Sequence, residues 1–483
     1  MNALESAFRM ASPRMRPRAV PMASALISGA IIGFYILLFS QAFFAHGLLA
    51  WSVGIAFVGY DTALQIFVAS QTLALWRGAS ARSVISASRP TVGVVVAAHN
   101  EATVLAATID ALLAQEDPPD QIWLADDGST DGSANVMASR YGLAPPDIDS
   151  ASAPSPIALR WLRLSHRGKA RALNTALGFI DTDIVLTVDA DTLLEPNAIT
   201  AIRRAFADDP DLVVGGGVLG PRCEGGLLAP ALQEFQTYEY IRNFLARYAW
   251  SRQESLLLIS GAFAAFRRDA LIAVGGFDPE CWVEDYELIH RLHRHAIENG
   301  LAWRVRILGD AYARTDAPAR LLPFLRQRRR WFGGFLQTQY WNRDMTGNPR
   351  FGALGLAMMP VKAIDTLQPI YGLTSSVLLI GFLATGRFGE LLPASGWLLA
   401  KIAFDLVYAV GSVELYRRWT GRGAGLSLRA ALVCVLVEPF CFQILRHLGA
   451  TWGWVAILTG SMTWGRARGG AKPAPTKLGE ECG

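Results

Sequence analysis

The sequence predicts an α/β domain built on a parallel sheet and flanked on both sides by membrane-spanning helices. Hydrophobic residues make up 52% of the 483 residues, but they collect toward the two ends of the chain. Between the ends, short apolar runs alternate with amphipathic stretches of helical period, which is typical of β-α-β units. Polar motifs follow several of these runs, where such sheets bind ligands. We therefore expect a globular domain over 90–345.

The N-terminal end predicts two membrane spans whose outer ends both face the cytoplasm. Residues 1–21 form a basic segment, and the uncharged run 22–45, of 24 residues, is long enough to cross the hydrocarbon core. A second apolar stretch completes a pair of transmembrane helices over 22–76. Because arginines also follow this pair, the positive-inside rule places the segment and the globular domain in the cytoplasm. Asp61, inside the second span, is a polar packing contact or part of a glycan path, and packing is favoured.

The C-terminal region, 354–465, predicts three or four further transmembrane or interfacial helices. Apolar runs cover 366–385, 395–416 and 428–446, and a shorter run rich in Trp and Gly covers 450–464. The short run either crosses the bilayer or lies in its interface, so the count of spans is five or six. The arginines between the second and third runs mark a cytoplasmic loop.

Charge and cysteine usage narrow the class of protein. The formal net charge of +4 is modest, so nucleic acid is not an expected partner. The five cysteines are scattered without a C-x-x-C pair, which argues against structural zinc and a disulfide framework and for a reduced compartment. The polar tail 469–483 is expected to be disordered. We expect a multi-pass protein of the cell membrane whose globular domain is cytoplasmic.

The globular middle shows strand and helix signals in alternation. Continuous apolar runs predict buried parallel strands, and apolar residues at helical spacing predict the helices between them. The strands are expected at 92–98, 122–125, 159–164 and 184–188, and the helices at 103–115, 130–140 and 169–179. Residues 144–156, rich in Pro, Ser and Ala, predict an inserted loop.

Polar residues stand at the carboxyl ends of three predicted strands. They are Ala98-His99-Asn100-Glu101, Asp126-Asp127-Gly128-Ser129 and Asp189-Ala190-Asp191. Three such motifs on one sheet edge predict a ligand site. Taken alone, the second motif is explained equally well as a turn followed by a helix cap. The two carboxylates of the third are oxygen ligands that suit Mg²⁺ or Mn²⁺ bridging a diphosphate.

Three later motifs carry candidate chemistry. Gly168-Lys169 opens a helix, where backbone N–H groups and the dipole favour anions, although a basic surface helix would look the same. Glu284 and Asp285 also open a helix, as dipole partners or as a source of the general base that an acceptor hydroxyl needs. The stretch 327–331 is either a basic interfacial helix or supplies Arg330 to a diphosphate and Trp331 to a sugar face. We expect both interpretations to hold, with some of the arginines at the membrane interface and another at the diphosphate.

Three histidines close together in the sequence resemble a set of metal ligands. His290, His293 and His295 are close in sequence, but His295 lies on a different helical face from His290. We therefore expect no metal there.

Seven motifs in order resemble the membrane-bound processive glycosyltransferases of family 2. They read A-H-N-E, D-D-G-S, G-K-A-R-A-L-N, V-D-A-D, S-G-A-F, V-E-D-Y and Q-R-R-R-W. The group includes cellulose, hyaluronan, chitin-oligosaccharide and poly-N-acetylglucosamine synthases, and 325–341 looks most like the last of these. The resemblance covers about 92–345 with the flanking spans. It departs from the family pattern at Val283, often Thr, and at Ser260–Phe263, where several relatives carry a Cys.

The resemblance implies a GT-A catalytic domain, an inverting single displacement and roles for matched residues. Asp285 would be the base that deprotonates the acceptor, and Asp189 and Asp191 would hold the metal, with Asp191 the more direct ligand. The donor would be bound by Asn100, Glu101, Asp126, Asp127, Lys169, Asp189 and Arg330, and the acceptor by Glu284, Gln327 and Trp331.

These expectations define one function and two alternatives. We expect transfer of a sugar, N-acetylglucosamine before glucose, from a UDP-sugar to the end of a growing β-linked polysaccharide, with export through the adjoining helices and with accessory export subunits as candidate partners. The first alternative is addition of a single sugar to a membrane lipid. The second is a non-catalytic export subunit, against which the intact set of Asp127, Asp191, Asp285 and Trp331 argues.

Overall fold

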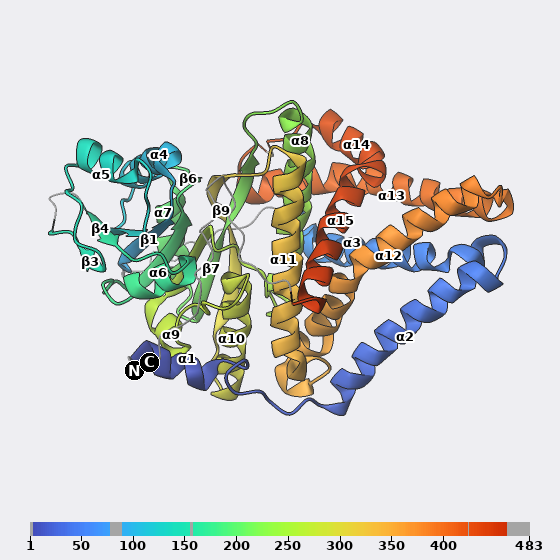
Figure 1. Ribbon diagram of the computed structural model, residues 1–483, viewed down its shortest axis with the longest axis horizontal. Helices are drawn as coiled ribbons and strands as arrows, with labels where there is room; N and C mark the ends of the chain where they lie inside the picture. The colour runs from blue at the N-terminus through green and yellow to red at the C-terminus, as the bar shows by residue number, and fades with distance from the viewer. Residues whose placement is uncertain (1–2, 78–88, 155–157, 424, 461–483) are drawn as a thin grey trace, which may run out of the picture.

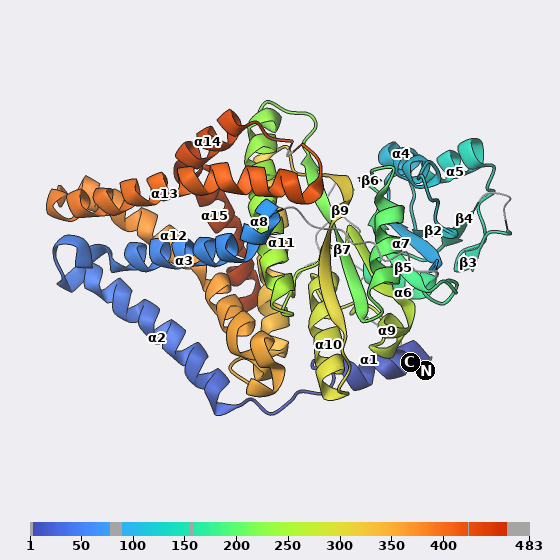
Figure 2. The same ribbon diagram turned by 180° about the vertical axis from the view of Figure 1, so that it is seen from behind.

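The computed structural model describes residues 3–77, 89–154, 158–423 and 425–460, so the predicted tail 469–483 lies outside the described residues. A sheet with its covering helices occupies one side of the molecule and a group of long helices the other (Figures 1 and 2). Two helices, α8 (Ala229–Arg252) and α11 (Leu321–Trp341), run between these parts. The long helices beyond them are α2 (Met22–Phe44), α3 (Ser52–Thr72), α12 (Met359–Ala384) and α13 (Phe388–Thr420).

In the part of the chain that the structure describes, nine strands form one sheet in the order β3-β4-β2-β1-β5-β8-β7-β9-β6. Their bounds are β1 Val92–Ala98, β2 Gln121–Asp126, β3 Ser150–Ala151, β4 Leu159–Arg163, β5 Ile184–Asp189, β6 Thr192–Leu194, β7 Leu212–Arg222, β8 Phe263–Arg267 and β9 Arg304–Asp316. The four predicted strands are confirmed as β1, β2, β4 and β5, and they pair in parallel. Their apolar runs are buried on both faces, as a sheet covered by helices requires.

The strand register aligns the predicted polar motifs at one edge. Ala98 at the end of β1 lies opposite Asp126 of β2, and Ala97 lies opposite Asp189 of β5. Because parallel strands end on the same side, the three motifs that follow them meet there.

The remainder of the sheet is mixed, which the sequence does not predict. Strand β8 runs antiparallel to both β5 and β7. An antiparallel strand starts where its neighbour ends, so the segment before β8 reaches the carboxyl end of β5, and the amide of Asp189 donates to the carbonyl of Ala262 at 3.2 Å. The mixed topology thus brings the S-G-A-F motif to the same edge.

The helices of the sheet domain lie close to their predicted positions. They include α4 (Ala102–Leu113), α5 (Ser133–Tyr141), α6 (Lys169–Ala176), α7 (Ala198–Asp208), α9 (Arg268–Ala273) and α10 (Glu284–Glu298). The expected start of α5 at residue 130 is wrong by three residues. Asp131 accepts the amide of Ser133 at 2.9 Å and the amide of Ala102 at 3.0 Å, so its side chain ends the preceding turn and joins it to α4.

Among the described residues, three helices are long and apolar enough to cross a membrane, and a bent pair makes a fourth if it counts as one span. They are Met22–Phe44, Gly47–Trp76 and Leu354–Ala384. This count is below the five or six expected, and α13 is not among the three. It is 33 residues long but contains Lys401 and Asp405. Lys401 pairs with Asp61 of α3 at 2.8 Å, which is the packing role favoured for Asp61.

The predicted span 428–446 is interrupted in the structure. Helix α14 (Leu428–Val437) and helix α15 (Phe442–Leu458) meet at an angle of 53°. Pro439 lies in the break and has no N–H to continue a helix. Glu438 beside it is buried and receives Arg242 of α8 at 2.6 Å, so the break is tied to the helix that adjoins the sheet.

Candidate functional site

Lys169 lies at the centre of the predicted motifs. Gly168 before it has φ +97°, a conformation that favours glycine, and Lys169 opens α6 directly beyond that turn. Its ammonium lies 2.5 Å from Asp189 and 3.5 Å from Glu284. One side chain therefore joins the end of β5 to the start of α10, although these elements are about a hundred residues apart in sequence.

The D-D-G-S motif supports the turn before Lys169. The buried carboxylate of Asp127 accepts the amides of Arg167 at 2.8 Å and Gly168 at 2.9 Å, and the ring of His166 at 2.8 Å. Asp126 accepts the amide of Ser129 and the indole N–H of Trp161, so its side chain is held within the protein. The interpretation of D-D-G-S as a turn therefore holds for Asp126. Asp127 instead fixes the loop that precedes Lys169.

The A-H-N-E motif lies at the exposed rim of the same edge. Asn100 has φ 58° and its side-chain oxygen accepts the amide of Thr130 at 2.7 Å, which joins the loops after β1 and β2. Glu101 precedes α4 and is half-buried. The exposed position of Asn100 leaves its surface open to a ligand.

The candidate base Asp285 has a fixed orientation. One oxygen accepts the amide of Gly261 at 2.7 Å, and the other accepts the amide of Tyr286 at 2.8 Å. A Cβ on Gly261 would lie only 3.1 Å from the Asp285 side chain, so the S-G-A-F glycine permits this close approach. Asp285 is half-buried, which leaves it reachable from solvent.

Charge at the site is concentrated in a partly buried cluster. Burial raises the pKa of Glu284, Lys169 opposes that shift, and the neighbouring charge of Asp285 adds to it. Burial alone would lower the pKa of Lys169, but the carboxylates of Asp189 and Glu284 outweigh it and raise that pKa. Perturbed groups of opposite charge in one half-buried cluster are typical of active sites.

The end of β5 fits a divalent cation. Asp189 and Asp191 are both half-buried, and Asp191 also accepts the hydroxyl of Thr315 at 3.3 Å. Two carboxylates and a hydroxyl are hard oxygen donors of the kind that Mg²⁺ and Mn²⁺ bind. Lys169 already places one cation against Asp189, so the carboxylate is oriented toward positive charge.

Two arginines of Q-R-R-R-W make different contacts in the structure. Arg330 is exposed, its Nη1 lies 3.5 Å from the carbonyl of Trp282, and its charge acts on Glu284. Arg328 instead forms a buried pair with Glu239 of α8 at 2.7 Å and lies over the ring of Trp331. The buried Oε1 of Gln327 has no hydrogen-bond partner in the described part of the chain.

Two histidine groups need a separate account. His290 and His293 are buried, and a ring nitrogen of each lies 2.8 Å from a backbone carbonyl, that of Tyr286 and that of Leu256 respectively. The second group, His99, Asp127 and His166, lies close enough to share an ion. Its carboxylate already accepts two backbone amides, and the two imidazole rings stack with their centroids 4.1 Å apart, which suits a flat stacking surface better than a metal site.

Arg247 of α8 is a site candidate that the sequence does not indicate. Its Nε and Nη1 are buried without a hydrogen-bond partner among the described residues. Burial lowers its pKa to about 10, and the charges of Tyr240 and Asp285 act against that shift. The guanidinium lies over the ring of Phe244, 4.6 Å from its centroid, but an N–H group buried without an acceptor is costly because its desolvation is uncompensated. Nothing in the local sequence N-F-L-A-R-Y distinguishes Arg247 from a surface arginine of an amphipathic helix.

Comparisons with known proteins show what the sheet domain is similar to. Residues 93–275 match the family model described as glycosyl transferase family 2. The hyaluronan synthase of Streptococcus pyogenes is 28% identical over 262 residues, 51% of this chain and 57% of the relative. A poly-β-1,6-N-acetyl-D-glucosamine synthase of Staphylococcus epidermidis is 27% identical over 204 residues, 41% of this chain and 45% of the relative. The chain thus matches about half the length of these relatives.

A solved structure supports the fold. A mannosyltransferase from Pyrobaculum calidifontis, in complex with GDP-mannose and Mn²⁺, superposes with a TM-score of 0.54 at 22% identity, over 81% of this chain and 99% of that one. The predicted GT-A fold is therefore confirmed, together with apolar helices that could cross a membrane.

Proposed function

Because this chain carries a family 2 glycosyltransferase domain, we propose that it transfers a sugar from a UDP-sugar to the end of a growing β-linked polysaccharide. The observation that carries the proposal is the single cluster formed by Lys169, Asp189 and Glu284 beside Asp285. In such a cluster, a cationic group can stabilise the leaving diphosphate while an acidic group takes the proton of the attacking hydroxyl.

In the proposed reaction, Asp285 is the general base. Its carboxylate takes the proton of the acceptor hydroxyl as the hydroxyl oxygen bonds to the anomeric carbon and the bond from that carbon to the diphosphate breaks. Attack from the face opposite the leaving group converts an α-linked donor to a β-linked product. The hydrogen bond from Gly261 to Asp285 fixes the direction in which the base acts.

Lys169 and Arg330 stabilise the departing diphosphate in this scheme. Lys169 lies at a helix start, where backbone dipoles favour anions, and Arg330 is exposed toward Glu284. A Mg²⁺ or Mn²⁺ ion held by Asp189 and Asp191 would supply further charge neutralisation. The remaining donor contacts are proposed for Asn100, Glu101, Asp126 and Asp127, with Asp126 acting by holding its loop.

The proposed polymer rests on the relatives and on the helices beside the site. One relative is named for poly-β-1,6-N-acetylglucosamine and another for hyaluronan, so N-acetylglucosamine is our first candidate sugar and glucose the second. Trp331 and Gln327 lie on α11 and would line the acceptor, with Glu284 at its reacting end. We place the catalytic domain at the cytoplasmic face of the cell membrane, with the product leaving through the adjoining helices.

A donor screen tests this proposal. Purified protein in lipid nanodiscs would receive radiolabelled UDP-N-acetylglucosamine, UDP-glucose or GDP-mannose with Mg²⁺ or Mn²⁺, and products would be separated by size and digested with linkage-specific hydrolases. We expect polymeric product from one UDP-sugar and its loss on chelation. Product of a single added sugar in the lipid phase would instead support the lipid-acceptor alternative, and no incorporation from any donor would contradict transfer activity.

A further inference from the structure

The N-terminal segment is docked on the sheet domain. Helix α1 (Ala3–Ala11) lies below α9 and α10 (Figure 1). A Cβ on Gly275 would lie 2.1 Å from the backbone nitrogen of Phe8, and Gly275 has φ +84°. Both facts restrict the position to glycine, because a side chain there would displace α1. The G-G-F-D segment therefore provides a fitted seat for the N-terminal helix.

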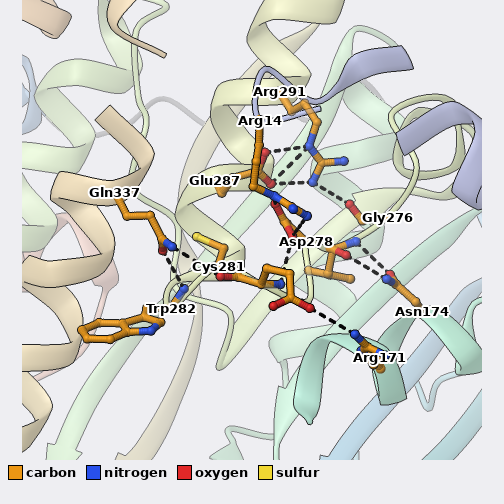
Figure 3. Close-up of polar contacts among 12 residues, drawn as sticks. Arg14, Arg171, Asn174, Gly276, Asp278, Cys281, Trp282, Glu287, Arg291 and Gln337 are labelled. Atoms are coloured by element: carbon orange, nitrogen blue, oxygen red, sulfur yellow. Dashed lines mark hydrogen bonds and ion pairs between the residues drawn. The ribbon is translucent and has the colours of Figure 1, made fainter. Parts of the chain in front are cut away.

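Arg14 anchors the same segment to a buried acid. Its Nε and Nη2 donate to the two oxygens of Asp278 at 2.9 and 2.8 Å (Figure 3). Asp278 is 0% exposed, and the guanidinium also lies over the rings of Phe8 and Trp341. Burial acts to lower the pKa of Arg14, but the hydrogen bonds and charge of Asp278 outweigh it and raise that pKa. A bidentate, charge-assisted pair is the strong form of this interaction.

A second buried acid makes Arg14 harder to replace. Glu287 of α10 pairs with Arg291 at 2.6 Å, and both side chains are buried. Burial raises the pKa of Glu287, and the negative charge of Asp278 contributes to that shift. Two arginines thus neutralise two neighbouring carboxylates, and one of the arginines comes from the N-terminal segment. Loss of Arg14 would leave Asp278 as a buried charge facing Glu287.

Asp278 begins the loop that leads to the candidate base. Its Oδ1 also accepts the amide of Glu280 at 2.9 Å, and Glu280 pairs with Arg171 of α6. Further along, the amide of Trp282 donates to Gln337 of α11 at 3.2 Å, and Glu284 and Asp285 follow directly. Figure 3 shows these contacts around the loop. The loop is therefore held from three directions, by α6, by α11 and by Arg14.

We propose that residues 3–14 form a clamp in which Arg14 is a positioning residue, holding the 276–285 loop so that Glu284 and Asp285 keep their reactive placement. The effect on turnover rests on the proposed function, whereas the effect on the loop does not. Arg14 acts through Asp278 and touches no reacting atom.

Cys281 reports on the loop without any substrate. Cys281 is 4% exposed, and its thiol lies 3.6 Å from the hydroxyl of Thr338 of α11. We would prepare the full chain with Cys281 as its single cysteine, in nanodiscs, and measure the rate of maleimide labelling. We expect Arg14→Gln to speed labelling on the order of tenfold, because the loop opens more often. Arg9→Gln is the matched control, since Arg9 is exposed on α1 and pairs with Glu5.

A rescue variant separates positioning from general stability. In Arg14→Gln/Asp278→Asn the buried charge is gone while an oxygen remains to accept the Glu280 amide, so labelling should return toward the parent rate. A second background with only Cys434, buried in the distant α14, should label at the parent rate in every variant. Unchanged Cys281 labelling in Arg14→Gln, no recovery in the double variant, or equal acceleration at Cys434 would each overturn the proposal.

The kinetic test follows once the donor screen has given an active parent. Arg14→Gln should lower kcat about tenfold or more with little change in KM for the donor, and the double variant should recover most of it. A rise in KM with unchanged kcat would overturn the positioning role. An inactive parent would contradict the proposed function and leave the labelling result for the clamp standing on its own.

Discussion

At the scale of single residues, the site holds charges that the fold would be more stable without. Burial raises the pKa of Glu284, so the fold disfavours its charged form, and Arg247 has buried N–H groups without partners in the described structure. Evolution retains such groups where binding or catalysis needs them, at a cost in stability. Substitution at these positions should therefore separate activity from stability.

Glu284→Gln should stabilise the protein and reduce its activity. Folding raises the pKa of Glu284, so ionising this carboxyl lowers the free energy of unfolding. This loss of stability is absent below the carboxyl's ordinary pKa, about 4.3, and is complete once the pH exceeds the raised pKa. The gain in melting temperature should therefore be larger at pH 8 than at pH 5, and Lys169 would keep Asp189 as its partner. Thermal unfolding at both pH values measures this, with the exposed Glu224→Gln as control. A lower melting temperature at pH 8 would contradict it.

Arg247→Gln tests the residue that the sequence did not indicate. We expect sugar transfer to fall by about tenfold to a hundredfold, because a cation facing the charge of Asp285 is lost. The melting temperature should stay level or rise, since an uncompensated buried charge is removed. Arg252→Gln, at the exposed end of the same helix, is the control. Full activity with a strong loss of stability would assign Arg247 to packing instead.

The sequence predicts which motifs gather at the site better than what each side chain does. Strand ends locate Asp127 and Asp189 because parallel strands end together. The sequence does not predict that Asp126 and Asp127 have different roles. Trp161 of β4 donates to Asp126, whereas Asp127 accepts an amide of the loop that precedes Lys169, and both contacts come from β4 and the loop after it. The sequence does not indicate Arg247, because what distinguishes this residue is that two of its N–H groups lack partners in the described structure. A missing tertiary contact leaves no pattern in the local sequence.

At the scale of elements, helix α15 packs on α11 with almost no space between the backbones. A Cβ on Gly453 would lie 2.7 Å from the carbonyl oxygen of Arg329 and 2.8 Å from the amide nitrogen of Gly333, and Gly449 meets Arg328 as closely. The two glycines, four residues apart, form the small-residue pattern that lets helices approach closely. The packing supports the helix that carries Gln327, Arg330 and Trp331.

Gly453→Ala should destabilise the protein although alanine favours helices. The intrinsic gain is about 1 kcal/mol, whereas forcing a methyl group between two backbones costs about 1–3 kcal/mol or more. Gly411→Ala in α13, where a Cβ meets nothing within 4 Å, should show the gain alone. Thermal unfolding of both variants in the same detergent measures the difference. Equal melting temperatures for the two variants would contradict the close packing.

The sequence predicts the strands of the first half of the sheet because each is a continuous apolar run. It does not predict the mixed second half, since the direction of β8 is set by where the preceding loop delivers it. The break between α14 and α15 was also missed. Pro439 lies within a mostly apolar stretch, so the sequence reads as one continuous span. The break in the helix is evident only in the structure, where Arg242 and Arg446 pair with the adjoining Glu438.

At the scale of the whole molecule, the helices separate into an end near the sheet and an end far from it. The turns between α2 and α3 and between α12 and α13 lie together at the far end, where Arg387 donates to the carbonyl of Ala42 (Figure 1). At the near end, Arg422 after α13 pairs with Glu195 of the sheet domain at 3.2 Å. The sheet domain therefore lies at one end of the long helices, and the arginine pattern of the sequence predicts that this end faces the cytoplasm.

Cysteine labelling tests this orientation. In a background without native cysteines, His46→Cys and Thr385→Cys at the far turns should react with a membrane-impermeant maleimide added to intact cells. Asp181→Cys, exposed on the sheet domain, should react only after lysis. Labelling of the Asp181 variant in intact cells would contradict a cytoplasmic catalytic domain.

The central claim is that acids far apart in sequence serve one donor, with Asp285 as the base. The most direct measurement compares Asp285→Asn with the parent, using calorimetry for UDP binding and radiolabelled donor for the rate of transfer, with the exposed Asp181→Asn as control. We predict that UDP affinity stays within about threefold while transfer falls by about 10²- to 10⁴-fold, because the base is lost and the diphosphate contacts remain. Transfer by Asp285→Asn at the rate of the parent would contradict the account.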